Sequence, residues 1–249
     1  MELVVKTEMN DKKTATMTIG QHLAELRRRI LLCICAVVLL GIASFVEYNA
    51  ILKLLTRPYC DLNLGNGCKL TAVGTLSAFS IRIKIAYYCG MLFSAPIIVW
   101  HIWRFVTPGL KKKERKYTLS FFIAGCAFFA MGVGMAFFTF GHALKFLNAI
   151  GGNSVETLYT ADSYIGLIIL MMVVFGLTFE FPVVLVGLQI ARIVTPNQLL
   201  KSWRYALIVI TIASAVLTPS GDPLSMMAMM IPLLFFYFFS ILIGKLARR

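Results

Sequence analysis

Two of the 11 acidic residues lie within runs of basic residues, a setting that suits a binding site for cations. Glu25 lies in HLAELRRR, and Glu114 lies in LKKKERKY. Neighbouring positive charges favour the ionised form of each carboxyl group. Two fixed carboxylates could hold a cation, and bidentate hydrogen bonding would select guanidinium over ammonium. The alternative is local charge pairing, because Glu25 reaches Arg28 and Arg29 at helical spacing and Glu114 has lysines close by.

A third carboxyl group, that of Glu180, is the only charged side chain from Ser163 to Ala191. An ionised carboxylate at membrane depth is costly, and apolar surroundings favour the neutral form, which can donate a hydrogen bond. Three interpretations stay open: a structural hydrogen-bonding group, a polar cavity that helps to assemble a partner or admits water, and a proton carrier. We expect this side chain to be buried, mainly protonated and turned into a helix bundle.

Two cysteines, Cys60 and Cys68, lie in PYCDLNLGNGCKL, which we expect outside the membrane, where disulfides persist. Asn66 and Gly67 supply a turn between them. A disulfide and two free thiols are both open. The other four cysteines fall in apolar runs and are expected to be buried apolar side chains. No CxxC or Cys/His cluster indicates a metal, and no cofactor is expected.

The composition is that of a membrane protein, because 59% of the 249 residues are hydrophobic and only 14% are charged. A soluble domain is about 25% charged. The net charge of +13 could suggest nucleic acid, but the basic residues cluster between apolar runs, so no nucleic-acid partner is expected. We predict an all-α polytopic membrane protein with six transmembrane helices, over Ile30–Val46, Ile85–Trp103, Tyr117–Leu144, Ser163–Ala191, Tyr205–Leu217 and Pro223–Gly244.

The lengths of these runs and the charges between them predict the topology. A spanning helix needs about 20 apolar residues. The fifth run is shorter and the sixth contains Pro232, so the fifth and sixth helices are expected to be short. Most of the 24 lysines and arginines lie before the first run, after the second and fourth, and after the sixth. By the positive-inside rule both termini are cytoplasmic. We expect residues 1–17 to form a disordered cytoplasmic tail and residues 18–249 a single six-helix domain.

Several motifs resemble the TatC family, the large subunit of the twin-arginine protein translocase. HLAELRRR resembles the family's opening signature, and FVTPGLKKKER resembles its first cytoplasmic loop. SAP, FEFP and LTPSGDP then follow in the family's order, with Pro58 in the first outer loop. The resemblance covers residues 18–244. One departure is that two residues separate Pro219 from Asp222, where some members have one.

The resemblance implies a function and a set of site residues. Glu25 and Glu114 would contact the paired arginines of a signal peptide, with Leu23 and Phe105 lining the adjoining surface. Glu180 would face a concave surface where a polar residue of a partner docks. Pro58 and Asp222 would be functional residues of the outer face, although Asp222 also suits a helix N-terminus.

The implied partners are the twin-arginine signal peptides of folded cargo, TatA and usually TatB, in a multimeric complex among membrane lipids. Transport would use the proton motive force across a bacterial-type cytoplasmic membrane, and no enzymatic activity is expected. Two other functions, intramembrane proteolysis and small-solute transport, are alternatives. An intramembrane protease lacks support, because Pro219 replaces the first glycine of a Gly-x-Gly-Asp motif. A proton-coupled small-solute transporter could use Glu180, but such folds usually show repeated halves, and none is visible.

Overall fold

The computed structural model describes residues 19–61, 70–106, 118–151 and 160–247. Within these ranges the chain is helical, apart from turns and one β-bridge between Thr71 and Thr160. The expected tail, residues 1–17, lies outside the described residues. The helices are α2 (Ile19–Val46), α3 (Tyr48–Leu55), α4 (Arg57–Cys60), α5 (Ser77–Val106), α6 (Thr118–Gly151), α7 (Ala161–Thr178), α8 (Phe181–Ile190), α9 (Pro196–Lys201), α10 (Trp203–Leu217) and α11 (Pro223–Ala247).

Among the described residues, the helices confirm the predicted all-α fold with six apolar membrane helices, of which one is short. Among the described residues, α2, α5, α6, α11 and the pair α7 and α8 are long and apolar enough to cross a membrane. The remaining apolar helix, α10, has 15 residues. At 1.5 Å per residue it is about 23 Å long, which is shorter than the ~30 Å of a hydrocarbon core. The fifth span is therefore short, as predicted.

The sixth helix is not short, contrary to the prediction. Helix α11 has 25 residues and contains Pro232 in its interior. Proline removes one backbone hydrogen bond, but packed neighbours allow a membrane helix to continue past it. The helix also extends beyond Gly244, where the uncharged run ends, because Lys245 lies in its last turn.

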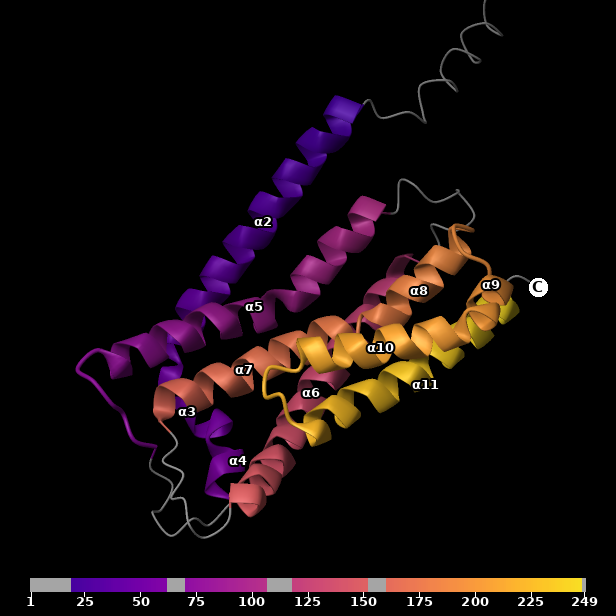
Figure 1. Ribbon diagram of the computed structural model, residues 1–249. Coiled ribbons are helices and arrows are strands. Elements are labelled where there is room, and N and C mark those ends of the chain that lie inside the picture. The colour runs from indigo at the N-terminus through magenta and orange to yellow at the C-terminus, as the bar shows by residue number, and fades with distance from the viewer. Residues whose placement is uncertain (1–18, 62–69, 107–117, 152–159, 248–249) are drawn as a thin grey trace, which may run out of the picture.

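Helix α7 lies at the centre of the bundle, and α2 lies at its edge (Figure 1). Ile165, Ile168 and Ile169 of α7 are fully buried, together with Phe140 of α6. Helix α2 packs mainly against α5 and leaves much of its apolar surface exposed to the surroundings. The position of α2 relative to the bundle therefore depends on its contact with α5.

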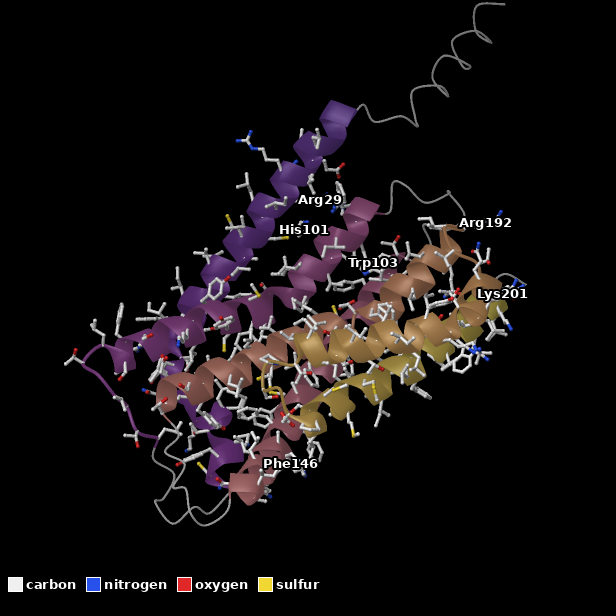
Figure 2. The ribbon with its side chains drawn as sticks, viewed as in Figure 1. Arg29, His101, Trp103, Phe146, Arg192 and Lys201 are labelled. Atoms are coloured by element: carbon white, nitrogen blue, oxygen red, sulfur yellow. The ribbon has the colours of Figure 1, made fainter. Side chains whose placement is uncertain are left out.

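The helix ends that carry basic residues gather at one end of the bundle, which we call the basic end. It comprises the start of α2, the end of α5, the turn after α8, and α9. Figure 2 shows Arg29, Arg192 and Lys201 at this end and Phe146 at the opposite end. Polar contacts also hold the opposite end together, since the Tyr164 hydroxyl donates to the Leu55 carbonyl at 2.9 Å and Lys84 pairs with Asp162 at 2.6 Å.

The α2–α5 contact depends on two glycines that allow the backbones to touch. A Cβ atom added at Gly90 of α5 would lie 2.7 Å from the Val37 carbonyl oxygen and 2.8 Å from Gly41 Cα of α2. Both distances are shorter than real Cβ contacts. Small residues at such crossings are typical of membrane helices, where close packing replaces the hydrophobic effect.

Substitution of Gly90 should loosen this crossing. Gly90→Ala should lower the free energy of unfolding by about 1–3 kcal/mol because the added methyl group overpacks the contact, and Tm in detergent should fall by several degrees. Gly134→Ala is the matched control, because nothing lies within 4 Å of its added Cβ. Equal melting temperatures for the two variants would contradict the proposed role of Gly90.

Candidate functional site

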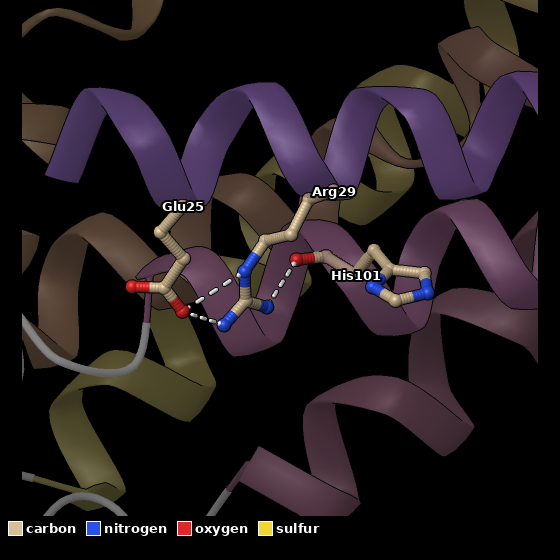
Figure 3. A network of polar contacts seen from close by, with 3 residues as sticks. All are labelled: Glu25, Arg29 and His101. Carbon is tan, nitrogen blue, oxygen red and sulfur yellow. Dashed lines mark hydrogen bonds and ion pairs between the residues drawn. The ribbon is translucent and has the colours of Figure 1, made fainter. Parts of the chain in front are cut away.

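The side chains of Glu25 and Arg29 form an ion pair on α2 at the basic end (Figure 3). Arg29 Nε donates to Glu25 Oε1 at 3.1 Å, and Arg29 Nη2 donates to the same oxygen. The third nitrogen, Nη1, donates across to α5, to the carbonyl oxygen of His101 at 3.1 Å. One guanidinium group therefore binds a carboxylate on its own helix and a backbone carbonyl on the neighbouring helix.

Helix geometry explains this arrangement. Glu25 and Arg29 are one turn apart on α2, where an acid four residues before a base forms a favourable pair. His101 lies near the C-terminus of α5, where the helix dipole favours a positive charge. The side chains are only 26% exposed for Glu25 and 12% for Arg29. The local pairing that the sequence allowed for Glu25 is thus present, with Arg29 as the partner.

The other residues of the predicted peptide site divide between described and undescribed segments. Leu23 lies on the first turns of α2 and is 58% exposed. Phe105 lies in the last turn of α5 and is partly buried. Glu114 lies outside the described residues. The meeting of Glu25 and Glu114 in one site therefore stays a prediction.

A long apolar groove runs along α2 and α5 beside this ion pair. Its volume is about 820 Å³. The lining runs from Leu26 to Phe45 on α2 and from Ile83 to Phe105 on α5, with Arg29 and His101 near its basic end. No motif in the sequence predicted this groove. Small residues such as Gly41 and Gly90 are typical of close helix crossings, but a groove beside such a crossing has no sequence pattern of its own.

The second site surrounds Glu180, which lies at a break between α7 and α8. Pro182 has no N–H group, so the helical bond to the carbonyl of Thr178 is missing. The Glu180 N–H donates to the Leu177 carbonyl at 3.2 Å, three residues back and not four, and the Glu180 carbonyl accepts from Val183 N–H at 3.0 Å and Val184 N–H at 3.1 Å. The break turns the fourth span at the position of its acidic residue.

The carboxyl group of Glu180 enters a mostly apolar pocket of about 210 Å³ between α5, α6, α7 and α8. A Cβ atom at Gly125 of α6 would lie 3.2 Å from Glu180 Oε2 and 2.9 Å from Val99 Cγ1. A glycine at this position therefore makes room for the carboxyl group. Within the described part of the chain, Glu180 Oε1 is buried and has no hydrogen-bond partner. This oxygen can accept or share a hydrogen bond with an incoming polar group.

The structure gives local contacts for the predicted outer-face residues. Asp222 is buried, and its Oδ1 accepts the backbone N–H of Ser225 at 2.7 Å. It thus caps the start of α11. Pro58 is buried in α4, close to the position that a Cβ atom of Gly141 would take. Cys60 is disulfide-bonded, while its predicted partner Cys68 lies outside the described residues, so their pairing stays a prediction.

Both described sites suit binding. The basic end holds a carboxylate that accepts a guanidinium group, and the interior holds a carboxyl oxygen in an apolar pocket. No group of three or more His, Cys, Asp or Glu side chains that could hold a metal ion occurs among the described residues.

Comparison with known proteins identifies the family. Residues 21–232 match the family model described as Sec-independent protein translocase protein (TatC). A TatC protein of Carboxydothermus hydrogenoformans is 37% identical over 95% of this chain and 95% of its own length, and one of Frankia casuarinae is 33% identical over 97% and 70%. A crystal structure of the twin-arginine translocase receptor TatC superposes with a TM-score of 0.77, at 30% identity, over 92% of this chain and all of that one. The chain is therefore a multi-pass membrane protein of the TatC family, a translocase subunit of the Tat protein-transport system.

Proposed function

We propose that this translocase subunit is the receptor for twin-arginine signal peptides and that Glu25 binds an arginine of the pair at the basic end. The supporting observation is the Glu25 carboxylate, which is held at the end of a membrane helix and already accepts two N–H groups of a guanidinium. Glu114 would supply the second carboxylate, because its segment follows α5, whose end lies beside the start of α2. Leu23 and Phe105 would contact the residues around the arginine pair.

The receptor would face the cytoplasm of a bacterial-type cell, in the cytoplasmic membrane. The charge distribution supports this orientation. The start of α2, the end of α5 and the end of α11 lie at the basic end, and basic loops stay on the cytoplasmic side of a membrane. The N-terminal and C-terminal segments would then both be cytoplasmic, which is the side from which a folded cargo protein arrives.

Neutralising Glu25 should weaken peptide binding without unfolding the protein. Glu25→Gln keeps the size of the side chain but removes its charge, and a charge-assisted bond to arginine is about twice as strong as a neutral one. We expect a loss of about tenfold or more in affinity for a synthetic Arg-Arg signal peptide, measured by fluorescence anisotropy with the protein in lipid nanodiscs. Glu114→Gln should act in the same direction, and a Lys-Lys peptide should bind more weakly to the unaltered protein. Normal affinity in the double Gln variant would rule out this site.

We further propose that the Glu180 pocket is where the small single-span partners, TatA and TatB, place a polar side chain when the multimeric translocase assembles to use the proton motive force. The support is a buried oxygen that lacks a hydrogen bond in an otherwise apolar pocket. Such a group is costly in isolation and becomes favourable once a donor reaches it. A partner helix with one polar residue at the same depth would provide that donor.

Glu180→Met should have opposite effects on stability and assembly. Removing an unpaired polar group from an apolar pocket should raise the free energy of unfolding by about 1 kcal/mol, whereas docking of a partner helix should be lost. Glu180→Gln keeps the hydrogen-bonding capacity and should retain docking. The measurements are Tm in detergent and the yield of cross-links to co-expressed TatA and TatB. Full cross-linking in the Met variant would exclude the docking role.

A further inference from the structure

We infer that Arg29 is an internal competitor for the peptide site: its guanidinium occupies the Glu25 carboxylate until an arginine of the signal peptide displaces it. This inference rests on the proposed function, because it assigns a regulatory role at the same carboxylate. It concerns a residue of the chain itself and predicts that the resting receptor binds peptide more weakly than the bare carboxylate would.

The resident group, Arg29, and the arriving group, a peptide arginine, have the same chemistry. Arg29 presents Nε and Nη2 to a single oxygen of Glu25. The preferred pairing of a guanidinium with a carboxylate is bidentate, with two parallel N–H···O bonds to the two oxygens. A peptide arginine that pairs with Glu25 in this bidentate way needs Oε1 as well as Oε2, so it must share Oε1 with Arg29 or displace Arg29 from it.

Arg29 is held in place by contacts with both α2 and α5. Because Arg29 lies one helical turn from Glu25 on the same helix, their pairing costs no translational entropy, whereas the binding of a separate peptide does. Arg29 Nη1 is fixed by the His101 carbonyl of α5 at 3.1 Å, and the side chain is only 12% exposed. Charge-assisted hydrogen bonds of this type contribute more than exposed ion pairs. The competitor is therefore bound firmly enough to affect the peptide affinity.

Displacement of Arg29 would also release its hydrogen bond to α5. The contact between Arg29 and His101 joins the basic ends of α2 and α5, which touch closely at Gly41 and Gly90 farther along. Loss of this contact would leave the basic end of α2 less tightly tied to the bundle. The apolar groove begins beside Arg29, so the entry to the groove would loosen when the arginine pair binds.

The test is the affinity of Arg29→Gln for synthetic Arg-Arg and Lys-Lys signal peptides, with the protein in nanodiscs at one fixed salt concentration. Removing the competitor should tighten binding by about three- to tenfold. The gain should be the same factor for both peptides, because the cost of displacing Arg29 does not depend on the ligand. It should disappear in the Glu25→Gln background, since no carboxylate is then left to compete for.

Arg28→Gln is the matched control. Arg28 is exposed, and its substitution removes the same charge one residue away, so it reports the general electrostatic effect. We expect a change below about twofold. Arg29→Lys is a second variant for the case that Arg29→Gln does not fold. Its compact ammonium group matches a carboxylate less well than a guanidinium, so it should raise the peptide affinity, but by less than Arg29→Gln.

The outcomes separate the two proposals. Unchanged or weaker binding by folded Arg29→Gln, or a gain equal to that of Arg28→Gln, would overturn the competitor role while leaving the Glu25 site intact. Full binding by Glu25→Gln would instead refute the proposed peptide site itself.

Discussion

The contact between α2 and α5 is the constraint on which the candidate binding surface at the basic end depends. Helix α2 lies at the edge of the bundle (Figure 1), and α5 provides most of its packing. Two features determine the geometry of this pair: the glycine crossing at Gly41 and Gly90, and the Arg29 guanidinium that joins Glu25 to the end of α5. Because Glu25 lies on α2, its position relative to α5 follows from these two contacts. An apolar groove of about 820 Å³ runs along both helices, from the crossing to Arg29 and His101.

The interior site follows from a different constraint, the need to place a carboxyl group within an apolar bundle. Pro182 breaks the fourth span next to Glu180, and Gly125 leaves space for the carboxyl oxygens. The described neighbours give one of these oxygens no hydrogen bond. Natural proteins seldom keep such a group unless it has a role. In a membrane, where every unsatisfied polar group is costly, this oxygen supports the proposal that Glu180 forms a hydrogen bond with a polar group of another subunit.

Much of this architecture could be predicted from the sequence, because spans and charges are local properties. Uncharged runs predicted the six spans, including the short α10. The length of α11 was not predicted, because neither Pro232 nor the charge of Lys245 ends the helix, which continues to Ala247. Helical spacing offered Arg28 and Arg29 as partners for Glu25, and the structure shows the pair with Arg29. The bond from Arg29 to His101 could not be predicted, because it joins residues 72 apart in the chain and its acceptor is a backbone carbonyl, which every residue has. The space beside Glu180 also depends on helices that meet only in the folded bundle.

The most direct test of the central claim is to map where the arginine pair of a signal peptide lies on the folded receptor. A peptide with a photoreactive residue next to its arginine pair would be cross-linked to the protein in nanodiscs, and the adducts located by mass spectrometry. The account predicts adducts on the first turns of α2, from Leu23 to Arg29, and on the last turn of α5 around Phe105, and it predicts that an excess of unlabelled Arg-Arg peptide abolishes them. Adducts confined to α3, α4 or the start of α7, at the opposite end of the bundle, would contradict it.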